Sequence, residues 1–175
     1  MKAITIACAL CLGLAVSSHG QGLVVFNNRV TPYVWAAIFG PEPSDPTIEK
    51  HGNLPDGPPP LRGIPAGTQT YGGAPLAGTG YTAQLWGGPL APSLDGLPFA
   101  PLVGSDPILQ LVATTPFRTG LAAGFVVTPA TANIVPDVLP GERASLEVRA
   151  WDNRGGTILS WPQVLADPTI LRGQS

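Results

Sequence analysis

Few side chains in this sequence can act as nucleophiles, general bases or metal ligands. The two cysteines are Cys8 and Cys11, and the two histidines are His19 and His51. Only His51 lies outside the first twenty residues, which have the pattern of a cleaved leader. A transition-metal site needs several imidazole or thiolate ligands, and a Ser-His-Asp triad would depend on His51, without a Gly-x-Ser-x-Gly elbow. We therefore expect no catalytic residue, no metal site and no cofactor.

Paired carboxylates offer one alternative. Glu147 and Asp152 share a segment with strong strand patterning, with Glu142 nearby, and two carboxylates can hydrolyse a glycosidic bond. However, we expect Glu147 beside Arg149 on a solvated strand face, where the cation keeps the carboxylate ionised. A glycan hydrolase is therefore the third of three functional hypotheses.

A calcium site at residues 152–156 is a further alternative. Asp152 and Asn153 offer oxygen ligands in a turn that Asp137 or Asp167 could join. The spacing does not match an EF-hand loop, so an ordinary hairpin turn is the preferred interpretation.

Aromatic side chains form the most suggestive set. The chain has four tryptophans, and strand alternation predicts Trp86 and Trp151 on solvated faces. Exposed rings on a rigid sheet can stack on sugars or fill a pocket of a partner. The alternative, which the pattern favours, is that loops or a second sheet cover both rings.

The N-terminus predicts export. Lys2 is followed by an apolar or small-residue run at residues 3–16, and Ser18 and Gly20 occupy the −3 and −1 positions of a peptidase site. Residues 1–20 are therefore a predicted signal peptide, too short for a membrane span. Residues 21–175 form one domain, which we expect to be secreted, extracellular or at the cell surface, without a membrane span.

Charge argues against nucleic acid as a partner. The chain has 11 acidic and 9 basic residues, and losing Lys2 leaves 8 basic residues and a net charge near −3. Binding to phosphate backbones needs clustered cations, and the arginines here are dispersed.

Composition and patterning predict short antiparallel strands. The chain is 44% apolar yet contains 22 glycines and 21 prolines, which interrupt regular elements. Residues 144–152 alternate most clearly, with a core face and a solvated face that includes Glu147 and Trp151. Strands are also expected at residues 22–29, 33–39, 81–86, 108–114 and 121–128, with a short edge at 134–135, a return strand at 157–159 and a capped helical turn at 160–166. We predict an all-β antiparallel sandwich, Ig-like or jelly-roll-like, with a long Pro/Gly-rich loop at residues 40–80.

Four sequence blocks carry a resemblance to a known family. They are residues 21–29, with Phe26-Asn27-Asn28-Arg29, and residues 81–89, 116–120 and 148–152. In this order they resemble a family of secreted proteins of unknown function from planctomycete and verrucomicrobial bacteria. Many of its members end in a PEP-CTERM sorting segment. The resemblance implies export, with no known activity and no catalytic residues to carry over.

The C-terminus departs from that family pattern. Residues 172–175 carry no Pro-Glu-Pro motif, apolar helix or basic tail, and Pro41-Glu42-Pro43 has no apolar span behind it. The ending is consistent with a truncated reading frame. The leading hypothesis is a non-enzymatic structural or adhesive protein of the cell envelope or matrix. Its partners would be extracellular polysaccharide or envelope proteins, and the first alternative is a carbohydrate-binding module using Trp86 or Trp151.

Overall fold

The computed structural model describes residues 22–45, 71–90 and 109–174. The predicted signal peptide, most of the loop at residues 40–80, and His51 lie outside these ranges. The described part is mostly β-strand with one short α-helix, and every strand pair is antiparallel. The all-β prediction is therefore confirmed at this level. No helix among the described residues is long and apolar enough to cross a bilayer.

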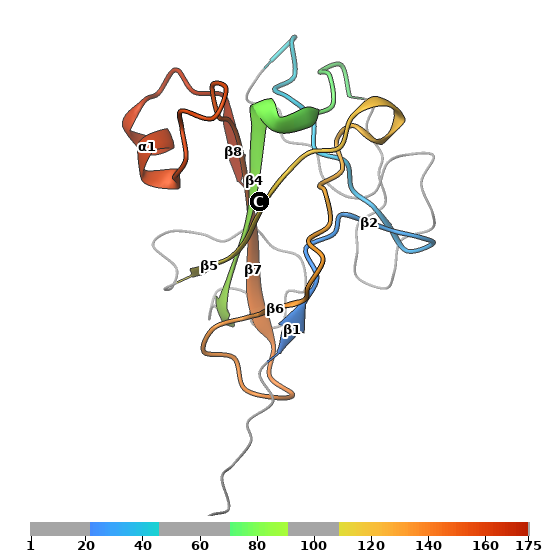
Figure 1. Ribbon diagram of the computed structural model, residues 1–175, viewed down its shortest axis with the longest axis vertical. Coiled ribbons are helices and arrows are strands. Elements are labelled where there is room, and N and C mark those ends of the chain that lie inside the picture. The colour runs from blue at the N-terminus through green and yellow to red at the C-terminus, as the bar shows by residue number, and fades with distance from the viewer. Residues whose placement is uncertain (1–21, 46–70, 91–108, 175) are drawn as a thin grey trace, which may run out of the picture.

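A four-stranded sheet in the order β5-β4-β7-β8 forms the centre of the molecule (Figure 1). Its strands are β4 (Tyr81–Pro89), β5 (Gln110–Pro116), β7 (Ala144–Asp152) and β8 (Arg172–Gln174). The two nine-residue strands β4 and β7 pair along their whole length, from Tyr81 opposite Asp152 to Pro89 opposite Ala144. The predicted bounds of β7 are confirmed, because its alternating pattern has no competing turn residue.

Strand β4 is longer than predicted. The strand predicted at residues 81–86 continues through Gly87 and Gly88, which both lie within the ladder to β7. A Cβ built on Gly87 would lie 3.0 Å from Val135, 3.1 Å from Leu146 and 3.2 Å from Val112. Glycine here makes room for packed neighbours, so the predicted end of the strand at residue 86 is wrong.

The first hydrophobic core lies on one face of this sheet. Ala83 and Leu85 of β4 and Ala150 of β7 point into it, and Phe26 and Val126 cover them from the other side. Alternation explains this set, because residues two apart on a strand share a face.

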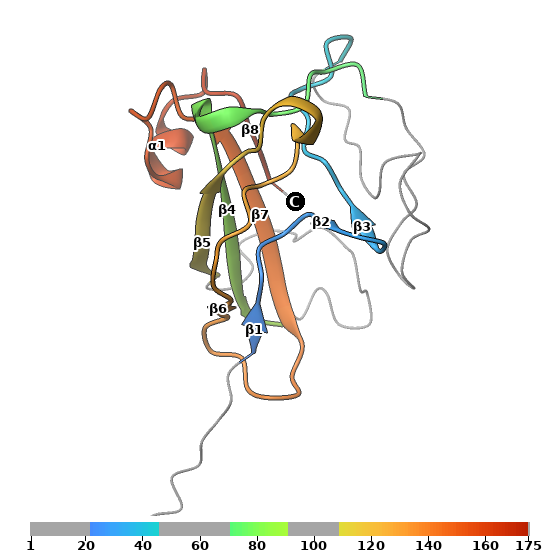
Figure 2. The ribbon, with the colours of Figure 1, turned by 45° about the vertical axis from the view of Figure 1, so that its right-hand side comes forward.

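Short pieces of strand form the covering layer. They are β1 (Leu23–Val24) paired with β6 (Asn133–Ile134), and β2 (Arg29–Val30) paired with β3 (Val34–Trp35). Figure 2 shows β1 to β3 on the opposite side of the sheet from α1. The predicted strands at 22–29 and 33–39 are thus only short pairs, and the edge at 134–135 is confirmed near its predicted place.

Asn28 connects three segments of this layer. Its Nδ2 donates to the carbonyls of Ala36 (2.8 Å) and Gly124 (3.0 Å), and its Oδ1 accepts from the N–H of Val126 (2.9 Å). The amide therefore supplies hydrogen-bond partners for the carbonyl of Ala36 and the N–H of Val126, and a second donor for the carbonyl of Gly124, which also accepts from the N–H of Ile38.

The predicted strand at residues 121–128 is wrong. Residues Gly120–Ala122 form a 3-10 helix, η3, and Gly124 has a φ of +85°. A Cβ on Gly124 would lie 2.8 Å from the Cβ of Ala37, so this position combines a left-handed backbone with close packing. Only Val126 forms a β-bridge there, to Phe117.

The C-terminal part covers the opposite face of the sheet. Helix α1 (Trp161–Ala166) begins after Ser160, with Pro162 in its first turn, as predicted. The expected return strand at 157–159 does not form. Instead, the N–H groups of Gly156, Thr157 and Ile158 all donate to the carbonyl of Asn153.

Candidate functional site

The polar and aromatic side chains of the second sheet face converge beside α1. We call this set the Arg149 cluster, and its members are Gln84, Trp86, Glu147, Arg149, Trp151 and Trp161. Strand register brings it together, because Gln84 lies opposite Arg149 and Trp86 lies opposite Glu147.

Arg149 is the centre of the cluster. Its guanidinium carbon lies 4.1 Å from the ring centroid of Trp86 and 5.2 Å from that of Trp161. Its Nε donates to Oε1 of Glu147, and the two side chains are only 16% and 7% exposed. The attraction of the two rings and the carboxylate for the guanidinium offsets the free energy that its removal from water costs.

The polar atoms around Trp86 form a short chain of hydrogen bonds. The indole Nε1 donates to Oε1 of Gln84 (3.0 Å), and Nε2 of Gln84 donates to Oγ1 of Thr114 on β5 (3.2 Å). Trp86 itself is partly buried. In the described ranges, no buried side-chain nitrogen or oxygen lacks a hydrogen-bond partner.

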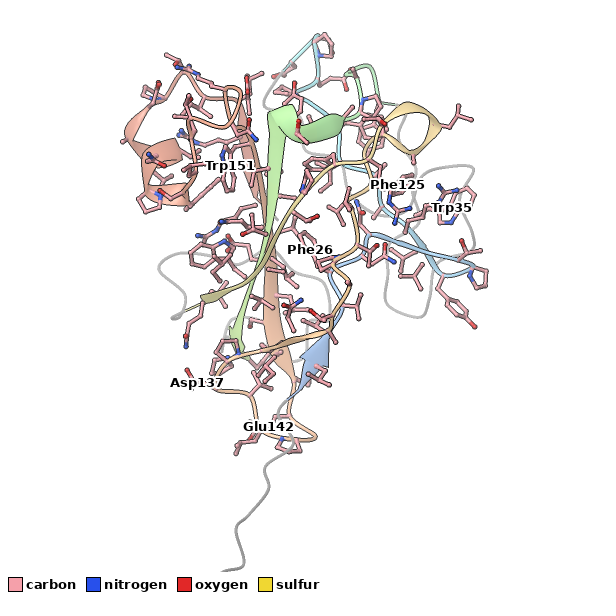
Figure 3. The ribbon with its side chains drawn as sticks, viewed as in Figure 1. Phe26, Trp35, Phe125, Asp137, Glu142 and Trp151 are labelled. Atoms are coloured by element: carbon pink, nitrogen blue, oxygen red, sulfur yellow. The ribbon has the colours of Figure 1, made fainter. Side chains whose placement is uncertain are left out.

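Trp151 is not on a solvated face. It is 1% exposed, its Nε1 donates to the carbonyl of Ile158 (3.1 Å), and its ring lies 5.9 Å from that of Trp161. Figure 3 shows Trp151 beside the α1 region. Alternation predicts its face correctly, and the ring is covered, as the favoured alternative expected, although the cover is α1 instead of a loop or a second sheet.

The carboxylates Glu147 and Asp152 do not form a pair. They are five residues apart on β7 and therefore point to opposite faces, about 16 Å apart along the strand, whereas glycosidase carboxyls lie about 5–9.5 Å apart. Glu147 pairs with Arg149, and Oδ1 of Asp152 accepts from the N–H of Arg154. This geometry contradicts the hydrolase hypothesis for this pair.

The turn at residues 152–156 holds its oxygen atoms in internal bonds. Asn153 is buried, donates to the carbonyl of Thr79 (2.8 Å) and to Oγ1 of Thr82 (3.0 Å), and accepts from Gly156. No group of three or more His, Cys, Asp or Glu side chains within the described residues could hold a metal ion.

Of the two carboxylates suggested as partners of that turn, Asp167 lies beside it but is bound to a cation, and Asp137 lies elsewhere. Asp167 pairs with Arg154 (3.2 Å). Asp137 lies at the other end of the molecule from Trp151 (Figure 3), where it accepts from Gln110. The segment is a turn, as the sequence favoured, but it is not part of a hairpin, because no return strand follows it at residues 157–159.

A second cation lies between aromatic rings in the covering layer. The guanidinium carbon of Arg29 is 5.3 Å from the ring centroid of Trp35 and 5.1 Å from that of Phe125. Figure 3 shows Trp35 and Phe125 together on the side of the molecule away from α1. Sequence patterning indicates neither this cluster nor the position of Arg149 between Trp86 and Trp161, because both depend on contacts between distant segments.

Comparison with known proteins identifies no relative for this arrangement. No protein-family model, curated protein or solved structure matches the chain.

Proposed function

We propose that the chain is a non-enzymatic secreted protein of the cell envelope or extracellular matrix, acting as a structural or adhesive β-sandwich. The exported character rests on the predicted signal peptide at residues 1–20. The sandwich form is supported by the two layers on either side of the first core, with an Ig-like or jelly-roll-like arrangement as the expected class. Its partners would be envelope proteins or extracellular polysaccharide.

The observation that carries the adhesive proposal is an outward-facing aliphatic pair. Leu23 of β1 and Ile134 of β6 lie directly opposite each other and are 69% and 51% exposed. Val25, two residues after Leu23, is 50% exposed. Adjacent aliphatic side chains on a small sheet favour contact with another surface more than a single exposed residue does.

Cosedimentation with an insoluble bacterial envelope fraction tests this function. The wild-type chain should sediment with the fraction, and the double variant Leu23→Ser/Ile134→Ser should lose about tenfold in affinity. Leu121→Ser is the matched control, because Leu121 is fully exposed on η3, away from the pair. Absence of sedimentation, or equal loss in the control, contradicts the proposal.

Carbohydrate binding through Trp86 is the second candidate function. The partly buried ring has Arg149 against it and the amide of Gln84 beside it, and sugar recognition commonly combines a ring with planar polar groups. Trp151 no longer supports this candidate, since its side chain is covered.

Affinity electrophoresis in gels containing soluble xylan or β-glucan separates the two candidates. Carbohydrate binding predicts retardation of the wild-type chain, weaker retardation of Trp86→Phe and none of Trp86→Ala. Trp35→Ala, on the other side of the molecule, should migrate like the wild-type chain. If neither polysaccharide retards the chain, this second function is rejected.

A further inference from the structure

The C-terminal residues 158–174, which we call the C-terminal clasp, build their own hydrophobic cluster. Trp161, Val164 and Ile170 come from the clasp, and Trp151 is the one buried sheet residue in this cluster. The first core, on the other sheet face, contains no residue of the clasp. The two faces therefore have separate sets of buried side chains.

Bonds within the clasp make it a unit. Gln163 Oε1 accepts from the N–H groups of Leu159 and Ser160, both at 2.9 Å. Arg172 of β8 donates to the carbonyls of Val164 (2.8 Å) and Asp167 (3.4 Å), which ties the last strand to the helix.

The clasp has fewer attachments to the rest of the molecule than the central strands have to each other. Its attachment includes the three-residue ladder between β8 and β7 and the contacts of Trp86, Trp151 and Arg149 with the clasp cluster. The remaining hydrogen bonds run from the N–H of Asp152 to the carbonyl of Leu171, from Nε1 of Trp151 to the carbonyl of Ile158, from the N–H of Ile158 to the carbonyl of Asn153, and from Arg154 to Thr169. An exposed pair, Arg154 with Asp167, adds little. By contrast, β4 is bonded on both sides, to β5 and β7.

We propose that the clasp opens as one unit while β4, β5 and β7 stay folded. A segment with its own cluster and few attachments has a lower opening free energy than a central strand. Opening removes the cover from Trp151 and frees the β7 edge at residues 149–151. This inference does not depend on the proposed function.

Native-state hydrogen exchange on the full chain tests the proposal. The amides of Val164 and Ile170, which donate within the clasp, should share one opening and exchange at least about tenfold faster than those of Ala83 and Leu85 in β4. Equal protection of the clasp and β4 would overturn the proposal.

Variants sharpen the test. Trp161→Ala should speed clasp exchange by about tenfold or more and leave β4 protection unchanged. Leu165→Ala, on the exposed side of the same helix, should change neither. Loss of β4 protection in Trp161→Ala would show that the clasp and sheet unfold together, which contradicts the proposal.

Arg154→Asn provides a milder second variant. It removes the ties to Asp167 and Thr169 with a residue that tolerates the φ of 49° at this position. It should speed clasp exchange by a few-fold, again without an effect on β4. Equal acceleration in β4 would count against the proposal.

Discussion

At the scale of single residues, several polar side chains in this protein connect segments that are distant in the sequence. Asn28 and Asn153 each bind backbone groups of segments distant in the sequence. Arg29 and Arg149 each lie between two aromatic rings. Three of these residues, Asn28, Arg29 and Arg149, lie in the sequence blocks at residues 21–29 and 148–152. Their contacts show that these blocks contain residues that hold the fold together.

Replacing Asn28 with alanine should cost about 2–4 kcal/mol of unfolding free energy. The change leaves the carbonyl of Ala36 and the N–H of Val126 without the side-chain partner that Asn28 supplies, in a partly buried place, whereas the carbonyl of Gly124 keeps its bond from the N–H of Ile38. Asn27→Ala, which loses one local bond to the N–H of Arg29, should cost about 1 kcal/mol or less. Urea denaturation measures both, and similar losses in the two variants would contradict the expectation.

Truncating Arg149 should be more damaging than removing its whole ion pair. Arg149→Ala leaves the buried carboxylate of Glu147 without its cation, at a cost of about 3–5 kcal/mol. The double variant Arg149→Met/Glu147→Gln removes both charges and keeps the side-chain volume, so it should recover most of that loss. A double variant no more stable than Arg149→Ala, measured by urea unfolding, would show that packing dominates instead.

At the scale of elements, prediction succeeded where local pattern was sufficient. Residues 144–152 alternate without interruption, and Ser160 with Pro162 marks a helix start, so β7 and α1 were predicted closely. It failed where glycine had a tertiary role. Gly87 extends β4 beneath packed side chains, and Gly124 turns the chain at a positive φ. Sequence shows a glycine in either case but not what packs against it.

Gln163 should be important for α1 because a six-residue helix has little stability of its own. Gln163→Ala removes the acceptor for the N–H groups of Leu159 and Ser160 and should cost about 1–2 kcal/mol. Gln163→Glu keeps the acceptor at the helix N-terminus and should be neutral or slightly stabilising. Urea denaturation with far-UV circular dichroism measures both, and equal loss in both would reject this explanation.

Lowering the pH should reduce the free energy of unfolding through protonation of Asp167, which lies directly after α1. Hydrogen bonds from the hydroxyl and then the N–H of Thr169, with the charges of Arg154 and Arg172, lower the pKa of Asp167 below its ordinary 3.8. Because the folded pKa is the lower one, the stabilisation is complete above pH 3.8 and is lost as pH falls through the folded value. Unfolding in urea from about pH 5 to about pH 2 should show a smaller loss of stability in Asp167→Asn than in the wild-type chain. Parallel curves would contradict this.

At the scale of the whole molecule, the sheet has a different cover on each face (Figure 2). Alternation placed Trp86, Glu147, Arg149 and Trp151 on one side correctly. It could not indicate that α1 would cover this side, since that depends on how a later segment folds back. The residues of the Arg149 cluster could likewise not be predicted from the sequence, because the register of β4 against β7 brings together residues that are far apart in the chain.

This long-range pairing should make folding slow for a chain of this size. Tyr81 pairs with Asp152 and Thr82 with Trp151, which are 71 and 69 residues apart in the sequence, so loop closure must precede the central ladder. Stopped-flow tryptophan fluorescence should show refolding in about milliseconds to seconds. Complete recovery within the mixing dead time would contradict this expectation.

The short interval before β1 makes the place of leader cleavage important. Leu23 begins the strand, and the carbonyl of Gly22 accepts from the N–H of Val135 (3.0 Å). A cut after Gly20 leaves only two residues ahead of that strand. If the predicted signal peptide were cleaved a few positions downstream, the chain would lack β1 and its ladder to β6, so the proposed export would require an accurate cut.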